Sequence, residues 1–183
     1  EGFKLAYLPQ IGQVRLRITG TGMDEAALHQ ILDEKAAILK ARFADIIYGY
    51  GTETLEGAVG KMLKERGLKL TTAESCTGGY MAHRITSVAG SSDYFVGSVI
   101  AYANEVKMQI LGVKAETLDT HGAVSEQTVI EMAEGAVRVL PADVSIAISG
   151  IAGPGGGSDS KPVGLAWIAV SNGQQTKTFS IRA

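Results

Sequence analysis

Residues 75–79, with the sequence SCTGG, combine a nucleophilic hydroxyl with small residues that favour a tight turn. An alternating apolar run at 68–73 predicts a strand before Ser75, and apolar residues at i, i+4 and i+7 after the glycines predict a helix. A strand that enters a helix in this way presents one side chain at its carboxyl end, close to the unpaired N–H groups of the helix. The turn could therefore hold an oxyanion or a phosphate beside the Ser75 hydroxyl. The simpler alternative is that Ser75 or Thr77 only caps the helix.

Tyr102 and Lys107 form a second candidate site. The mostly apolar run 95–102 predicts a buried strand, and Asn104 is predicted to cap the next helix, which puts Lys107 in its first turn. A cation is unfavourable at the positive end of a helix, so this position and burial would together lower the pKa of Lys107. A neutral lysine can act as a general base, with Tyr102 as a hydrogen-bonding partner. The alternative is a solvated surface lysine and an aromatic residue that ends a strand.

The glycine-rich stretch from Ser149 to Gly157 is a third candidate. Its backbone N–H groups could approach an anion closely, or it could be a mobile surface loop. It is not a Walker A loop, because Lys161 follows a serine and precedes a proline. Ligands bind at the carboxyl ends of neighbouring strands in open α/β sheets, and we expect the three candidates to meet there.

The histidines and the single cysteine favour no rival mechanism. His29, His83 and His121 show no metal-ligand spacing with one another or with Cys76, so we predict no metal and no cofactor. A Ser-His-Asp triad assembled in space stays open, although His29 and His83 lie in helical patterns. Cys76 could replace Ser75 as the nucleophile, but a lone cysteine behind a turn is more often a small buried residue.

Strands and helices alternate from Thr52 onward. Thr52 and Ser125 are predicted to cap helices, and the Asn-Gly pair at 172–173 predicts a β-hairpin. Further strands are expected at 143–148, 163–170 and 175–181. This order predicts an α/β fold, in which a mixed sheet carries helices on both faces in three layers, α/β/α.

The first 50 residues predict a separate small α+β domain. Alternating runs within 3–19 predict two strands, Asp24 is predicted to cap a helix, and 44–48 reads as a third strand. A turn at 49–51 marks the boundary, giving domains at 1–50 and 51–183. Residues 1–50 hold six basic and six acidic side chains, so we expect no nucleic acid as a partner.

The composition is that of an ordinary globular protein. The 183 residues are 45% hydrophobic and 20% charged, with a net charge of −2 and no apolar run long enough to span a membrane. One cysteine fits a reducing compartment, so we expect a cytoplasmic protein with no membrane partner. A homodimer is the default expectation. Because the sequence opens on Glu1, we expect a fragment of a longer chain.

Four segments resemble one known family. They read TTAESCTGG (71–79), AYANEVKMQILGV (101–113), HGAVSE (121–126) and AISGIAGPGGGSDSKPVG (147–164). Together and in this order they resemble the CinA C-terminal domain, the nicotinamide mononucleotide amidohydrolase family, from about Thr52 to the chain end. Residues 1–50 are similar to the KH-like connecting domain that precedes it. The family continues beyond the last strand, which implies that this chain is truncated at its C-terminal end.

The resemblance implies a serine amidase that converts nicotinamide mononucleotide to nicotinic acid mononucleotide and ammonia. Ser75 matches the family's nucleophile, Lys107 its base and Tyr102 an assisting tyrosine. Ser149 matches a hydroxyl that contributes to the substrate site. The residue patterns of the turn and of the glycine-rich stretch predict further substrate-binding residues, namely Thr77, Gly78, Gly79 and Gly150. A non-catalytic nucleotide-binding module of a competence or damage-inducible protein is the alternative.

Overall fold

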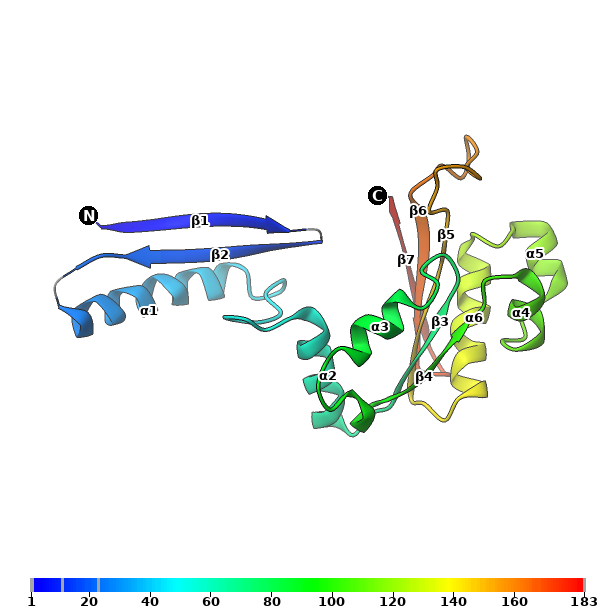
Figure 1. The fold of residues 1–183 in the computed structure, drawn as a ribbon, viewed down its shortest axis with the longest axis horizontal. Helices are drawn as coiled ribbons and strands as arrows, with labels where there is room; N and C mark the ends of the chain where they lie inside the picture. Colours follow the sequence, from blue (N-terminus) through cyan, green and yellow to red (C-terminus); the bar gives the residue numbers. More distant parts are fainter. Residues whose placement is uncertain (1, 11, 23, 183) are drawn as a thin grey trace. The chain divides into compact units, whose positions relative to one another are not determined.

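The computed structural model describes residues 2–10, 12–22 and 24–182 and divides the chain into two compact units, Glu1–Tyr50 and Gly51–Ala183 (Figure 1). In the first unit, β1 (Phe3–Gln10) and β2 (Gln13–Gly20) form an antiparallel pair, followed by α1 (Glu25–Arg42). Asp24 accepts hydrogen bonds from the N–H groups of Ala26 and Ala27 and thereby caps α1 as predicted.

The predicted strand at 44–48 is wrong. This segment forms turns, because the N–H groups of Ile46 and Ile47 both donate to the carbonyl of Phe43 at 3.0 Å. Backbone groups that close turns in this way are not available for a ladder with a neighbouring strand. The first unit therefore has the order β-β-α instead of the expected β-β-α-β.

The second unit is built on a five-stranded mixed sheet with the strand order β4-β3-β5-β6-β7, which confirms the predicted mixed sheet. At its centre, β3 (Leu70–Glu74) pairs in parallel with β4 (Phe95–Ile100) and β5 (Val144–Gly150). On the far side, β6 (Leu165–Ser171) and β7 (Thr176–Arg182) continue the sheet in antiparallel fashion. Every residue of β3 is buried, which fits a central parallel strand covered on both faces.

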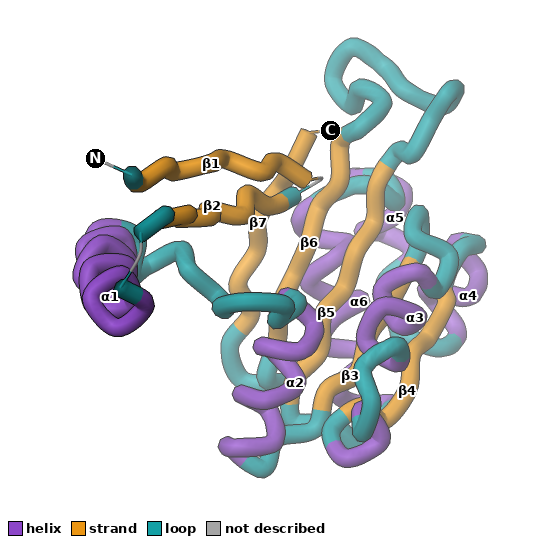
Figure 2. The backbone as a smooth tube through the Cα atoms, turned by 60° about the vertical axis from the view of Figure 1, so that its left-hand side comes forward, coloured by secondary structure: helices purple, strands orange, loops and turns teal. Residues whose placement is uncertain are grey.

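Helices cover both faces of this sheet (Figure 2). On one face lie α2 (Leu55–Arg66), α3 (Tyr80–Thr86) and the short 3-10 helix η1 (Ser91–Asp93), and on the other lie α4 (Asn104–Gln109), α5 (Ala115–His121) and α6 (Glu126–Val139). Alternate residues of β3 enter two different cores: Leu70 packs with Leu63 and Ile85, whereas Ala73 packs with residues of α6 such as Met132. The sheet thus separates two apolar clusters.

Sequence signals located most helix ends, with three differences. The N-cap of α4 is Ala103 and not Asn104, and Lys107 lies in the last turn of this six-residue helix instead of its first turn. The cap of α2 is Thr54, whose Oγ1 accepts from the N–H of Gly57 at 3.1 Å, and not Thr52. The prediction that Ser125 caps α6 is confirmed by its bond from the N–H of Thr128. The helix α5 was not predicted, because its seven residues carry only Ala115 and Leu118 as an apolar stripe.

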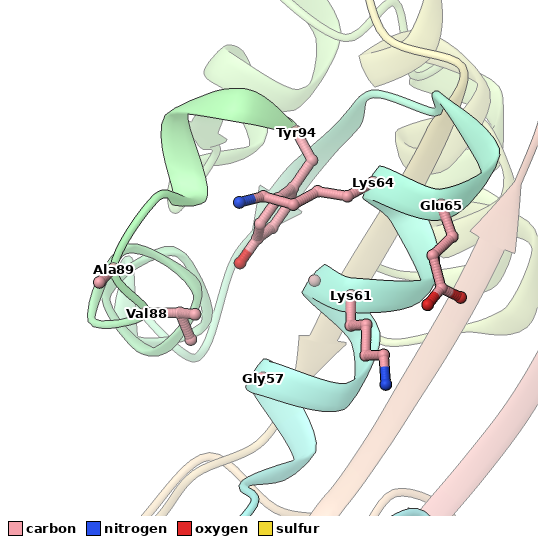
Figure 3. A pocket seen from close by; sticks show the side chains of 8 residues that line it. Gly57, Lys61, Lys64, Glu65, Val88, Ala89 and Tyr94 are labelled. Carbon is pink, nitrogen blue, oxygen red and sulfur yellow. The ribbon is translucent and has the colours of Figure 1, made fainter.

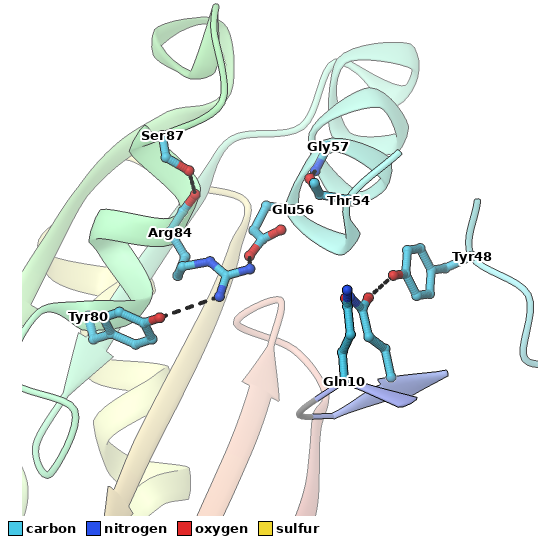
Figure 4. A network of polar contacts seen from close by, with 9 residues as sticks. Gln10, Tyr48, Thr54, Glu56, Gly57, Tyr80, Arg84 and Ser87 are labelled. Atoms are coloured by element: carbon cyan, nitrogen blue, oxygen red, sulfur yellow. Dashed lines mark hydrogen bonds and ion pairs between the residues drawn. The ribbon is translucent and has the colours of Figure 1, made fainter. Parts of the chain in front are cut away.

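Contacts between side chains fix α3 against α2. Arg84 of α3 forms an ion pair with Glu56 of α2 and also donates to the Tyr80 hydroxyl at 3.4 Å (Figure 4). Because Arg84 is half exposed at its side chain, this pair adds only a modest free energy to folding. The ion pair orients α3 relative to α2 on the face of the sheet that both helices cover.

Tyr94 lies beneath α2 with its hydroxyl unpaired. Its ring is buried and its oxygen has no hydrogen-bond partner among the residues that the structure describes. The ring lines a pocket of about 270 Å³ between α2 and residues 88–89 (Figure 3). Gly60 makes room for the ring, since a Cβ at this position would come within 2.5 Å of the hydroxyl.

We expect Tyr94→Phe to leave the free energy of unfolding unchanged or to raise it by up to about 1 kcal/mol, because a buried hydroxyl without a partner costs stability. Tyr94→Ala should lower it by roughly 3–5 kcal/mol through the cavity it leaves. Urea denaturation of the three proteins measures both effects. A loss above about 1 kcal/mol in Tyr94→Phe would mean that the hydroxyl binds a group in the pocket.

Candidate active site

Ser75 lies at the carboxyl end of the central strand. It follows Glu74, the last residue of β3, and its N–H donates to the carbonyl of Ile148 in β5 at 3.0 Å. Residues two apart in a strand share a face, so Ser75 continues the face of Ala73, which is covered by α6. Ser75 is buried, with 8% of its surface exposed at the edge of the sheet.

The Lys107 amine reaches the same edge of the sheet from α4. Its Nζ donates to the carbonyls of Ala101 and Tyr102, both at 2.9 Å. These carbonyls directly follow β4, and the N–H of Ala101 donates to the carbonyl of Glu74 at 2.8 Å. Neighbouring strands lie about 5 Å apart, so the two carbonyls that hold the amine stand one strand away from the end of β3, where Ser75 begins the turn.

Burial makes Lys107 a candidate base. The side chain is only 1% exposed, which excludes the alternative of a solvated surface lysine. Desolvation lowers the pKa of Lys107, while electrostatic interactions with Cys76 and Glu105 raise it. A neutral amine carries two N–H groups, and the two carbonyls of 101 and 102 accept them. The remaining lone pair is then free to take a proton from another group.

Tyr102 contributes its backbone to this arrangement. Its carbonyl holds Lys107, but its side chain is 74% exposed and its hydroxyl makes no hydrogen bond with any residue that the structure describes. The expected contact between the Tyr102 hydroxyl and Lys107 is therefore not formed in this structure. An assisting role for the phenol would require contact with a bound substrate.

The turn after Ser75 is held together by its own backbone. The N–H of Gly78 donates to the Ser75 carbonyl at 3.1 Å, and that of Gly79 donates to the Glu74 carboxylate at 3.1 Å. Both N–H groups are therefore already engaged within the turn, although Gly78 and Gly79 were predicted to bind the substrate. Both glycines have positive φ, at 59° and 100°, a conformation that side chains rarely adopt.

Two other N–H groups of the turn remain available. Those of Cys76 and Thr77 have no oxygen acceptor among the described residues, although both lie close enough to the Cys76 sulfur to lower the pKa of its thiol. N–H groups without an oxygen acceptor in such a turn can donate to an oxyanion. Burial nonetheless raises the pKa of the Cys76 thiol, and this is the largest influence on it. The cysteine is therefore a poor nucleophile near neutral pH.

Ser149 and Gly150 end the neighbouring strand β5. Ile148 pairs with Glu74, so Ser149 stands beside Ser75 in the sheet. The Ser149 hydroxyl is buried and donates to the carbonyl of Ala123 at 2.7 Å, which ties β5 to the segment before α6. Gly150 has a packing role, since a Cβ there would come within 2.8 Å of the Leu165 carbonyl in β6.

Glu74 was missed as a functional candidate. It is fully buried, and its carboxylate accepts hydrogen bonds from the N–H groups of Gly79, Met81 and Ala82 and from the Thr77 hydroxyl. A glutamate at the end of an otherwise uncharged buried strand was the signal that could have found it.

Neither a metal cluster nor a membrane span is found in the described ranges. No group of three or more His, Cys, Asp or Glu side chains among residues 2–10, 12–22 and 24–182 is placed to hold a metal ion. Within the same part of the chain, no helix has the length and apolar character needed to cross a membrane.

Known proteins match both the sequence and the fold. A CinA-like protein of Cytophaga hutchinsonii is 44% identical over 178 residues, and one of Parasynechococcus marenigrum is 50% identical over 173 residues. These matches cover 97% and 93% of this chain but only 43% and 41% of the relatives, so the chain spans about two fifths of their length.

Solved structures of the same superfamily share this architecture. The competence/damage inducible protein CihA from Agrobacterium tumefaciens is 42% identical, with a TM-score of 0.68, over 69% of this chain and 78% of that one. A CinA superfamily protein from Escherichia coli is 36% identical, with a TM-score of 0.69, over 76% and 83%. The family description "CinA C-terminal domain" matches residues 52–183. From residue 52 onward, the chain belongs to the CinA C-terminal domain family.

Proposed function

We propose that residues 51–183 form an amidohydrolase that converts nicotinamide mononucleotide to nicotinic acid mononucleotide and ammonia. The observation that carries this proposal is the buried Lys107 amine, held by two carbonyls at the end of the strand next to Ser75. A serine with a lysine of lowered pKa is a known pairing for acyl transfer without histidine. The substrate follows from the resemblance of the four segments to the amidohydrolase family.

The proposed reaction uses Ser75 as the nucleophile. Neutral Lys107 takes the proton of the Ser75 hydroxyl, whose oxygen attacks the carboxamide carbon of the substrate. The N–H groups of Cys76 and Thr77 stabilise the oxyanion of the tetrahedral intermediate. Lys107 then protonates the carboxamide nitrogen, which leaves as ammonia when the C–N bond breaks, and water hydrolyses the acyl-enzyme to release the acid. Tyr102 and Ser149 are proposed to contact the nucleotide.

Ammonia release from nicotinamide mononucleotide by the full-length protein tests this proposal. Ammonia and nicotinic acid mononucleotide should appear in equal amounts, at a rate proportional to the protein concentration. Calorimetry under the same conditions measures binding of the nucleotide. Saturable binding without ammonia would instead support a nucleotide-binding module, and the absence of both would exclude this substrate.

Further expectations belong to the whole protein. The family match begins at residue 52, so the KH-like character of residues 1–50 stays a prediction. We also propose a homodimer in the cytoplasm with no nucleic acid partner. Light scattering on the full-length protein measures the oligomeric state.

We expect Cys76→Ala to keep kcat for ammonia release within about threefold of wild type. Burial raises the pKa of the thiol, so the Cys76 sulfur is protonated and weakly nucleophilic at neutral pH. The N–H groups that we assign to the oxyanion belong to the backbone and survive the substitution. Steady-state kinetics at pH 7–8 measure the effect. A loss of kcat above about 10³-fold, the scale of a lost nucleophile, would make Cys76 the nucleophile in place of Ser75.

A further inference from the structure

Glu74 has an unusual place among the charged residues of the sheet. It is fully buried at the end of the central strand, and no cation forms an ion pair with it among the described residues. A carboxylate in such a place is costly unless hydrogen bonds replace its water. Glu74 directly precedes Ser75, so the groups that donate to its carboxylate indicate what this side chain does at the site.

Both carboxylate oxygens of Glu74 accept hydrogen bonds from the segment that follows Ser75. Oε2 accepts from the Thr77 hydroxyl at 2.7 Å and from the N–H groups of Gly79 and Met81 at 3.1 and 3.0 Å. Oε1 accepts from the N–H of Ala82 at 2.8 Å. The carboxylate therefore spans residues 77–82 and joins the end of β3 to the first turn of α3.

These contacts close a ring around the proposed nucleophile. The backbone leaves β3 at Glu74, passes through Ser75 and Cys76, and returns to the Glu74 side chain at Thr77 and Gly79. The bond from the Gly78 N–H to the Ser75 carbonyl lies inside this ring. Ser75 and the free N–H groups of residues 76 and 77 are thus fixed relative to one another by one side chain.

We propose that Glu74 is a positioning residue, whose carboxylate holds the Ser75 hydroxyl and the N–H groups of residues 76 and 77 in the geometry for attack. This inference rests on the proposed function of the same site. Glu74 itself touches no reacting atom in this arrangement, because its oxygens are occupied by the turn. Catalysis is sensitive to such placement, since an error of about 1 Å can cost roughly 10²-fold in rate.

Glu74→Gln tests the carboxylate with the least change of shape. An amide nitrogen fits best at the Oε1 position, where the hydroxyls of Thr72 and Ser98, at 3.4 and 3.5 Å, can rotate to accept from it. The N–H of Ala82 cannot rotate and loses its acceptor. The variant should therefore fold with a loosened turn, and Thr77→Val, which removes only the hydroxyl bond to Oε2, provides a milder second change.

Glu56→Gln is the matched control. The Glu56 carboxylate also holds α3, but through Arg84 in its last turn rather than through the N–H groups at its start (Figure 4). Both substitutions remove one negative charge and weaken one attachment of the same helix. Only Glu74→Gln changes the residues next to Ser75.

Steady-state kinetics on the full-length protein should separate the two variants. We expect Glu74→Gln to lower kcat by about 10–100-fold with KM within about threefold, and Thr77→Val to lower it by about 3–10-fold. Glu56→Gln should keep kcat within about threefold. A folded Glu74→Gln protein with the wild-type kcat would overturn the inference, and so would an equal loss in Glu74→Gln and Glu56→Gln.

Amide hydrogen exchange gives a readout that does not depend on activity. The N–H groups of residues 79, 81 and 82 should exchange at least about tenfold faster in Glu74→Gln than in Glu56→Gln. Should the wild-type protein release no ammonia, the proposed function fails, and exchange alone decides whether Glu74 orders the turn. Unchanged exchange at these three positions would overturn that role as well.

Discussion

Ser75→Ala is expected to lower kcat for ammonia release by at least about 10³-fold, the scale on which the loss of a serine nucleophile acts in other hydrolases. The neighbouring Cys76 thiol is a poor replacement for this hydroxyl, because burial raises the pKa of the thiol. The substitution removes one oxygen from a residue whose backbone is anchored to Ile148, so the turn should keep its shape. Binding of nicotinamide mononucleotide should persist within a few-fold. Single-turnover ammonia release and calorimetry measure the two effects separately.

Ser145→Ala is the control for this experiment. Ser145 is another buried serine, and its hydroxyl donates to the carbonyl of Ala133 at 2.7 Å near the opposite end of β5. Its loss should cost about 1 kcal/mol of stability and leave kcat unchanged. Ammonia release by Ser75→Ala at the wild-type rate would reduce Ser75 to a residue of the turn and contradict the proposed mechanism.

The sheet and the positions of its strand ends could be predicted because local patterns agreed with the fold. The run before Ser75 and the Asn-Gly turn at 172–173 each carry their own signal, and the structure has a strand and a hairpin there. The strand predicted at 44–48 was wrong because the apolar residues of this segment are typical of a strand, whereas strand formation also requires a partner strand. This segment has no such partner among the residues that the structure describes.

The parts of the candidate site that lie at strand ends could be predicted from local sequence patterns. Ser75 and Lys107 each sit where a strand meets a helix, and parallel neighbours bring such places to one edge of the sheet. The bonds of Glu74 could not be foreseen, because they depend on how tightly the glycine pair folds α3 back over the strand end. In the same turn, the N–H groups of Gly78 and Gly79 already have acceptors and are not free to donate to a ligand.

The Lys107 amine should set the pH dependence of the reaction. The base must be neutral to accept the Ser75 proton, so kcat/KM should rise with pH and level off once Lys107 has lost its own proton. Desolvation lowers the pKa of Lys107, so the midpoint of this rise should lie below the ordinary pKa of lysine. Lys107→Arg, which stays charged throughout, should be at least about 10³-fold less active at every pH.

Glu105→Gln provides the sharper test of this assignment. The negative charge of Glu105 favours the protonated amine and raises the pKa of Lys107, so its removal should move the midpoint of the pH profile to lower pH. The plateau rate should stay the same, because Glu105 only changes the field at the amine. Low ionic strength enlarges the shift, since salt screens the interaction. A midpoint that moved upward or stayed fixed, with Lys107→Arg inactive, would mean that another group titrates in the profile. A shift to lower pH is the result expected for Lys107, because the charge of Glu105 raises the pKa of this amine.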